Sequence, residues 1–161
     1  TRLLELARKH SVKLFGDLQC SSQIGSILRF KEFDLICPTE REARIALGDN
    51  ESGLEWIAQT LRDKTKSNDL LIKMGGDGFI VYTSENSFLQ RQHFPALAVN
   101  PLDVTGAGDS LLAAMSVSVC AGASLMEASA IGTCMASIAV QTVGNIPVSY
   151  ERLQTLLLSM S

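Results

Sequence analysis

The stretch Asp103-Val-Thr-Gly-Ala-Gly-Asp109 runs directly into an apolar segment, Ser110-Leu-Leu-Ala-Ala-Met-Ser-Val-Ser-Val-Cys120. Two glycines flank Ala107, and because they carry no side chain the backbone there can turn tightly and approach a ligand closely. The apolar segment has helix length, and we expect a helix over residues 106–121. The amides of residues 106–108 would then lie at a helix N-terminus, where unpaired N–H groups and the helix dipole favour an anion. The stretch therefore predicts a phosphate-binding turn.

Asp109 follows in the first turn of the expected helix, close to any anion that Gly106, Ala107 and Gly108 would hold. We interpret it as a candidate catalytic base, and the three preceding amides as groups that stabilise negative charge on the reacting phosphoryl group. A Gly-x-Gly turn followed by an acidic residue is also how an ordinary loop enters an ordinary helix, with the carboxylate complementing the helix dipole. The turn taken alone leaves both interpretations open.

The order of residues in this heptapeptide closely resembles the second signature of the PfkB, or ribokinase-like, carbohydrate kinases, Asp-Thr-x-Gly-Ala-Gly-Asp. Val104 stands where the family usually has Thr, and Thr105 falls at the variable third position. The resemblance implies an α/β fold, a three-layer Rossmann-like sheet flanked by helices, present here as a partial C-terminal half. It also implies ATP as the phosphoryl donor, Asp109 as the base for a sugar hydroxyl, and Thr105 as a nucleotide contact.

A second stretch begins with Asp34-Leu-Ile-Cys37, which has the pattern of a buried strand ended by Pro38. Thr39 can cap a helix over residues 40–47, with Glu42 at the third position as in a capping box. The stretch is also similar to the family's Pro-Asn-x-x-Glu motif, whose Glu helps to organise magnesium and phosphates through water. Thr39 replaces the family's Asn. Glu42 is therefore either a reciprocal cap alone or also a residue of the magnesium site.

A third stretch, Asp69-Leu-Leu-Ile-Lys-Met74, predicts a strand that is followed by Gly75-Gly-Asp-Gly78 and a second strand over residues 79–82. A hairpin with a glycine turn is the default interpretation. In the resemblance, Lys73, Gly75 and Gly78 occupy the places of the family's Thr-x-Gly-x-x-Gly, which lines the nucleotide. Lys73 replaces Thr there, and its ammonium can reach a nucleotide phosphate as a point charge.

Two more helices are expected after the phosphate-binding turn, one from a cap at Ser124 to about residue 142 and one over residues 148–160. The first is rich in small residues, which usually let another helix pack closely. In the family, the matching helix and the following loop form one wall of the adenine pocket, so the resemblance implies nucleotide contacts at Ala136, Ala139 and Gly144. The family counterpart of Asp103 helps to bind a monovalent cation, and an Asx turn is the alternative role for Asp103.

The remaining segments predict a helix near residues 3–10, a strand over 12–15, a short helix over 21–33, a surface helix over 51–64 and a strand over 87–93. With 161 residues, the chain is long enough for one compact domain and not for two. Apolar residues make up 46% and charged residues 19%, the balance of a globular protein.

Charge and cysteine content exclude several classes of partner. The net charge of −3 comes without a basic cluster, so we expect neither nucleic acid nor a membrane surface as a partner. The cysteines lie far apart with no Cys-x-x-Cys pair, which disfavours a zinc site. The four cysteines are Cys20, Cys37, Cys120 and Cys134. The last three have apolar neighbours and are interpreted as small buried residues in a reducing compartment, which favours the cytoplasm.

The resemblance spans nearly the whole chain but corresponds to only the C-terminal half of a typical family member. The sugar-binding portion, with its own glycine signature and lid sheet, has no counterpart here. We therefore expect residues 1–161 to be the single nucleotide-binding portion of a sugar kinase, inactive as an isolated fragment. The implied cofactors are ATP, Mg²⁺ and K⁺, the implied partner is a small-molecule sugar, and a homodimer is a compatible assembly.

Two other readings stay open. The chain can be a nucleotide-binding or assembly module that does not turn over alone. It can also be an unrelated dinucleotide-binding domain. The sequence lacks the Gly-x-Gly-x-x-Gly motif with an acidic residue about 20 positions further on, which argues against this alternative. The segment around Pro38-Thr-Glu-Arg-Glu-Ala-Arg44 is close to that of heptose-kinase-like family members.

Overall fold

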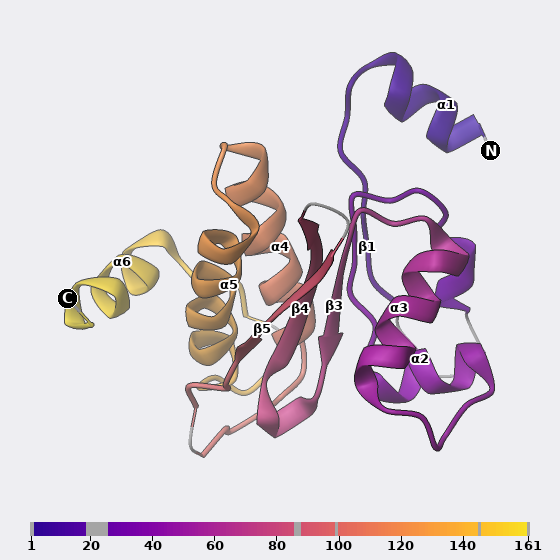
Figure 1. Ribbon diagram of the computed structural model, residues 1–161. Coiled ribbons are helices and arrows are strands. Elements are labelled where there is room, and N and C mark those ends of the chain that lie inside the picture. The colour runs from indigo at the N-terminus through magenta and orange to yellow at the C-terminus, as the bar shows by residue number, and fades with distance from the viewer. Residues whose placement is uncertain (1, 19–25, 86–87, 99, 145, 161) are drawn as a thin grey trace. The chain divides into compact units, whose positions relative to one another are not determined.

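The computed structural model describes residues 2–18, 26–85, 88–98, 100–144 and 146–160. The chain forms two compact units (Figure 1). The first, here called the sheet unit, comprises Thr1–Met74 and Phe79–His93. The second, here called the helical unit, comprises Gly75–Gly78 and Phe94–Ser161.

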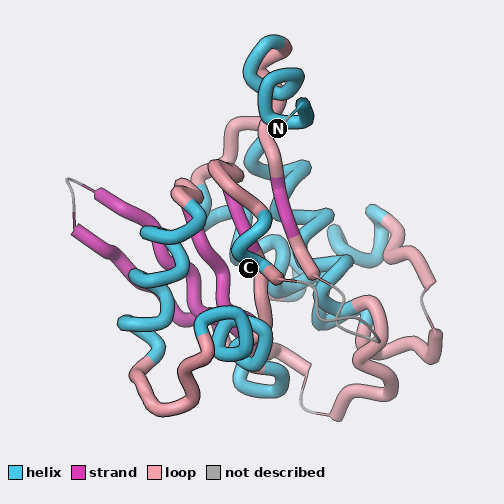
Figure 2. Tube along the Cα trace, turned by 90° about the vertical axis from the view of Figure 1, so that its right-hand side faces the viewer, coloured by secondary structure: helices cyan, strands magenta, loops and turns pink. Residues whose placement is uncertain are grey.

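The sheet unit is built on a mixed sheet of five strands whose spatial order follows the chain, β1-β2-β3-β4-β5. The first three strands are parallel, and β4 runs antiparallel to β3. Long ribbons formed by β4 and β5 are visible in Figures 1 and 2. The strands are β1 (Phe15–Gly16), β2 (Leu35–Ile36), β3 (Asp69–Lys73), β4 (Phe79–Glu85) and β5 (Phe88–Phe94).

The helices of the sheet unit enclose its hydrophobic core. Alternate residues of β3, Leu70 and Ile72, share one buried cluster with Ile57 and Leu61 of α3. Because burying each such side chain contributes about 1.5–3 kcal/mol, this cluster is a main source of the unit's stability. The helices are α1 (Arg2–Lys9), the 3₁₀ helix η1 (Ile27–Arg29), α2 (Glu40–Leu47) and α3 (Leu54–Thr65).

The helical unit contains α4 (Ala107–Cys120), α5 (Leu125–Ala139), α6 (Tyr150–Ser159) and the 3₁₀ helix η2 (Gly75–Asp77). Close contact between α4 and α5 depends on Gly132. A Cβ placed on Gly132 would lie 2.7 Å from Leu111 Cδ1 and 2.9 Å from Met115 Cγ, inside normal contact distance. The prediction that the small residues of this helix serve helix packing is confirmed. The cap predicted at Ser124 is also confirmed, as part of a capping box with Glu127.

Two expectations are corrected by the structure. The described part of the helix predicted over residues 21–33 contains only η1, and residues 21–25 lie outside the described residues. Helical geometry does not continue to the end of that segment, because Glu32 has a φ of 59°. The predicted burial of Cys120 is wrong, since it is exposed at the last residue of α4, whereas Cys37 and Cys134 are buried as expected. Cys20 lies outside the described residues.

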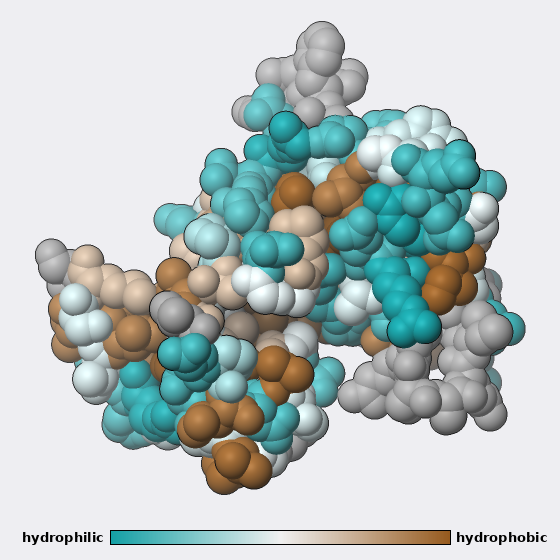
Figure 3. Space-filling view, turned by 90° about the horizontal axis from the view of Figure 1, so that it is seen from below, coloured by the Kyte–Doolittle hydropathy of each residue, from teal (hydrophilic) through white to brown (hydrophobic). Residues whose placement is uncertain are grey.

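The surface mixes polar and apolar side chains, and brown and teal areas alternate on the face shown in Figure 3. Within the described ranges, every helix is too short or too polar to cross a lipid bilayer.

Candidate active site

The predicted phosphate-binding turn, residues 103–109, lies at the start of α4 in the helical unit. Gly106 is the N-cap residue and has a φ of 76°, a left-handed conformation that glycine adopts without strain. The Ala107 N–H donates to Val104 O at 3.3 Å, and the Ser110 N–H donates to Gly106 O at 2.9 Å. Among the described residues, no main-chain carbonyl accepts the amides of Gly106 and Gly108. The turn therefore presents main-chain donors at the positive end of a helix of 14 residues.

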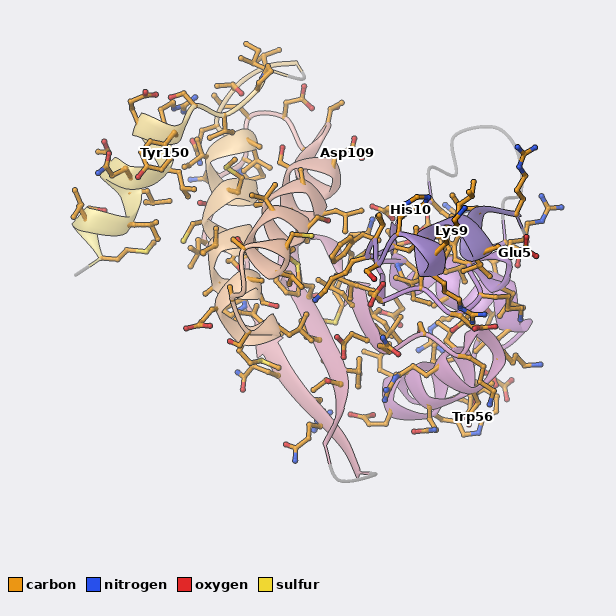
Figure 4. All side chains as sticks on the ribbon, turned by 90° about the horizontal axis from the view of Figure 1, so that it is seen from above. Glu5, Lys9, His10, Trp56, Asp109 and Tyr150 are labelled. Atoms are coloured by element: carbon orange, nitrogen blue, oxygen red, sulfur yellow. The ribbon has the colours of Figure 1, made fainter. Side chains whose placement is uncertain are left out.

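Asp109 is the third residue of α4, directly after this turn. Its side chain is exposed, and Figure 4 shows it at the N-terminal end of the helix. An anion held by the amides of the turn would thus have a carboxylate as its immediate neighbour in the chain. This is the arrangement that the base assignment needs, and the role itself stays a prediction.

Asp103 fastens the beginning of the turn to the segment that follows α5. Its Oδ1 accepts the Thr105 N–H at 2.9 Å, and its Oδ2 accepts the Gly144 N–H at 2.9 Å. The Leu102 N–H also donates to Val140 O at 2.8 Å. The Asx turn given as the alternative role of Asp103 is therefore present. The structure brings together three of the predicted site residues, Asp103, Thr105 and Gly144.

The hydrogen bonds from Thr105, with a smaller contribution from the Gly144 amide, hold the pKa of Asp103 below its usual value. Because the folded-state pKa is lowered, the stabilisation from this carboxylate is present near neutral pH and is lost as the pH falls through that pKa. An ionised Asp103 keeps lone pairs beyond those used by the two amides. Its predicted contact with a monovalent cation is compatible with this geometry and stays a prediction.

In the sheet unit, polar residues gather at the carboxyl ends of the parallel strands. Asp17 follows β1, and Lys73 ends β3. The Lys73 Nζ lies 2.7 Å from Asp17 Oδ1 and 2.5 Å from Asp17 Oδ2, and the two side chains are only 16% and 13% exposed. Asp17 was not among the site residues predicted from the sequence. The available signal was an acidic residue directly after a parallel strand, because the carboxyl ends of such strands share the ligand-binding edge of an α/β sheet.

Burial raises the pKa of the Asp17 carboxyl group, and the Lys73 ammonium and the Leu18 amide oppose that rise. Burial also raises the pKa of the nearby Cys37 thiol, and the negative charge of Asp17 adds to this effect. Cys37 is therefore a protonated, inert thiol at neutral pH.

Glu42 forms the reciprocal half of a capping box at the start of α2. Its Oε2 accepts the Thr39 N–H at 2.7 Å, and Thr39 Oγ1 accepts the Glu42 N–H at 3.2 Å. The capping interpretation is confirmed. In the part of the chain that the structure describes, no three His, Cys, Asp or Glu side chains are placed to hold a metal ion. Participation of Glu42 in a magnesium site through water stays a prediction.

Gly75 and Gly78 lie in the connection between β3 and β4, which pair from Lys73↔Phe79 onward as the predicted hairpin. Both have left-handed backbones, with φ values of 61° and 86°. Gly75 faces open space, whereas a Cβ on Gly78 would lie 2.1 Å from Phe94 O. Gly78 is therefore required by close backbone packing as well as by its own conformation.

The two alanines predicted to contact the nucleotide, Ala136 and Ala139, lie on α5. A nearby hollow of about 590 Å³ is lined by α5, by α6 and by residues 97–98 of the helical unit. Its walls include Ser137 and Ile138 of α5 and Gln141 just after that helix, and neither alanine contributes to it. The nucleotide contacts at both alanines stay predictions.

A model of the pfkB family carbohydrate kinases matches residues 1–151 of this chain. The chain belongs to the PfkB carbohydrate kinase family. It is 34% identical over 125 residues to the bifunctional protein HldE of Campylobacter fetus subsp. fetus, covering 76% of this chain and 26% of that protein. It is 30% identical over 148 residues to the bifunctional protein HldE of Shewanella piezotolerans, covering 91% of this chain and 30% of that protein.

Solved structures show the same fold. Ribokinase from Thermotoga maritima superposes with a TM-score of 0.78 at 25% identity, covering 97% of this chain and 52% of that one. Ribokinase from Arabidopsis thaliana, complexed with ribose and ATP, gives a TM-score of 0.79 at 24% identity, covering 97% of this chain and 51% of that one. Phosphofructokinase-2 from Escherichia coli, in complex with potassium, gives a TM-score of 0.79 at 21% identity, covering 99% of this chain and 51% of that one.

The predicted ribokinase-like α/β fold is therefore confirmed, and the alternative of an unrelated dinucleotide-binding domain is removed. This PfkB-family chain spans less than a third of the curated relatives named above and about half of the solved structures.

Proposed function

We propose that this chain is the ATP-binding, phosphoryl-transfer portion of a carbohydrate kinase, which moves the γ-phosphoryl group of ATP to a sugar hydroxyl. The observation that carries the proposal is the turn at the N-terminus of α4, where main-chain donors are followed at once by Asp109. Phosphoryl transfer mainly requires that the protein position the attacking and leaving oxygens in line and neutralise charge on the transferred group. A helix N-terminus with an adjacent carboxylate supplies groups suited to both tasks.

In the proposed reaction, the amides of Gly106 and Gly108 stabilise the charge on the γ-phosphoryl oxygens, and the Ala107 amide joins them by exchanging its 3.3 Å hydrogen bond to Val104 O for one to the phosphoryl group. Asp109 accepts the proton of the sugar hydroxyl as that oxygen forms its bond to phosphorus. The bond between the γ-phosphorus and the bridging oxygen of ADP breaks, and ADP leaves with the electron pair. Asp109 then returns the proton to water.

The remaining roles follow the family resemblance. Lys73, Gly75, Gly78 and Thr105 contact the nucleotide, with the Lys73 ammonium at a phosphate, and Ala136, Ala139 and Gly144 lie toward its adenine. Mg²⁺ supplies neutralisation of the phosphate charge, with Glu42 holding one of its waters. Asp103 takes part in a monovalent cation site.

We further propose that both units together form one nucleotide-binding portion and that the sugar is bound by a further part of the protein. The share of the solved structures that the chain spans, about half, supports this proposal. It also favours the second candidate, a module that binds nucleotide and does not turn over alone. A cytoplasmic location and a homodimer complete the proposal, with no contact to nucleic acid or membrane.

Titration calorimetry with ATP and ADP, with and without Mg²⁺, tests the proposal. We expect both nucleotides to bind, and ATP to bind more tightly with Mg²⁺ present. A folded protein that binds neither nucleotide would contradict both candidates. A kinase assay on the intact protein across a panel of sugars then separates them, because only the first candidate consumes ATP in the presence of one sugar.

The double role proposed for Glu42 can be separated by two substitutions. Glu42→Gln keeps an oxygen that can accept the Thr39 N–H but removes the charge, so we expect the free energy of unfolding to change by less than about 0.5 kcal/mol. Thr39→Ala removes the other half of the capping box and should cost about 1 kcal/mol while the carboxylate stays.

The readout for magnesium is the Mg²⁺ concentration that gives half-maximal kinase activity. We expect it to rise several-fold in Glu42→Gln and to stay near the wild-type value in Thr39→Ala. Equal magnesium dependence in both variants would leave Glu42 with the capping role alone.

A further inference from the structure

The ion pair between Lys73 and Asp17 joins residues 56 positions apart in the chain. Both carboxylate oxygens of Asp17 contact the Lys73 Nζ, at 2.7 and 2.5 Å. An ammonium has three N–H donors, so this contact uses two and leaves one. The Lys73 backbone is fixed as well, because its N–H donates to Pro38 O at 2.9 Å. The ammonium is thus held in one place at the ligand-binding edge of the parallel strands.

The pair carries no net charge, which weakens its electrostatic attraction for an anion. A lone ammonium attracts a phosphate as a full positive charge, whereas a phosphate beside this pair is also repelled by Asp17. The repulsion is substantial because both side chains are mostly buried, where solvent screens charges poorly. Among the described residues, the other charged group that acts on Asp17 is Glu42 of α2, and the nearby Cys37 thiol after β2 is neutral. Glu42 adds negative charge, so among the described residues Lys73 is the one cation that offsets the Asp17 carboxylate.

A purely stabilising role explains this arrangement poorly. Removing two charges from water is costly, and a buried ion pair gives little net stability compared with apolar residues of similar size. A lysine side chain also loses much conformational freedom when it is held in one geometry. The location of the pair at the carboxyl ends of β1 and β3 points instead to a ligand.

We propose that Asp17 is a positioning residue that sets how strongly Lys73 binds a nucleotide phosphate. The Asp17 carboxylate fixes the ammonium, leaves one N–H for the phosphate, and offsets the positive charge that would otherwise bind the phosphate tightly. This inference rests on the proposed function, in which Lys73 contacts the nucleotide. Its consequence is a weakened hold on both ATP and ADP, which favours release of the product.

The test is a double-mutant cycle on the intact protein, with ADP affinity measured by calorimetry. Asp17→Asn keeps the shape of the side chain and removes its charge, and we expect it to tighten ADP binding about 10-fold. Its ADP affinity should also fall more steeply with added salt than that of the wild type, because an uncompensated ammonium is screened. Lys73→Met should weaken ADP binding. It also removes the main group that opposes the rise of the Asp17 pKa by burial, which favours the neutral form of this carboxyl group. Asp17→Asn in the Lys73→Met background should therefore change the ADP affinity less than 2-fold.

Two controls complete the design. Asp17→Glu keeps the charge and should bind ADP within about 3-fold of the wild type, and Asp63→Asn removes an exposed carboxylate from α3 and should have no effect. Thermal denaturation checks each variant for folding, and Asp17→Ser serves for the same comparison where Asp17→Asn does not fold.

The inference is overturned if removal of the Asp17 charge weakens ADP binding, leaves it unchanged, or tightens it equally with and without Lys73. Failure of the wild type to bind any nucleotide would instead reject the proposed function. The two failures are therefore distinguishable.

Discussion

Asp109→Asn is expected to lower kcat about 10²–10⁴-fold in the intact kinase, the range for loss of a general base. Asparagine has nearly the same size but cannot accept the proton of the sugar hydroxyl at neutral pH. The Kd for ATP should change little, because the amides of the turn remain in place. Steady-state kinetics with the cognate sugar, combined with calorimetry for ATP, measures both quantities.

Glu151→Gln provides a matched control for Asp109→Asn. Glu151 also lies exposed in the first turn of a helix of the helical unit, α6, so its substitution removes a similar interaction with a helix dipole. That interaction is worth about 0.3–1 kcal/mol in either helix. We expect both variants to lose stability within this range and only Asp109→Asn to lose turnover. Full kcat in a folded Asp109→Asn enzyme would contradict the assignment of the base.

Gly78→Ala is expected to have the largest effect on stability. The left-handed conformation costs a residue with a Cβ roughly 1–2 kcal/mol, and the new methyl group would overlap the backbone around Phe94. Backbone cannot move aside as the end of a flexible side chain can, so overpacking adds about 1–3 kcal/mol. We therefore expect a loss of about 2–5 kcal/mol in the free energy of unfolding, measured by denaturant titration.

The same short segment supplies a graded control series. Gly76 has open space around its Cβ position and no positive φ, so Gly76→Ala should change stability by less than about 0.5 kcal/mol. Gly75 has open space but a φ of 61°, so Gly75→Ala should cost only the conformational part, roughly 1–2 kcal/mol. A Gly78→Ala variant no less stable than Gly75→Ala would show that the contact with Phe94 is not restrictive.

Local features were accessible from the sequence because neighbouring residues determine them. The turn before α4, the capping boxes at Thr39 and Ser124, and the hairpin after Lys73 each depend on residues within a few positions of one another. For such features the residue types alone specify the backbone and its hydrogen bonds. The helix predicted over residues 21–33 failed in its described part, because an apolar pattern does not reveal a backbone reversal such as that at Glu32.

The sequence by itself determined the family, the turn at the start of α4 and the place of Asp109 beside it. Only the tertiary structure decided which distant groups meet: Asp17 with Lys73, 56 positions apart, and Asp103 with the Gly144 amide, 41 positions apart. The physical reason is that a turn or a cap is fixed by its own neighbours, whereas a contact between distant segments depends on how strands pair and helices pack.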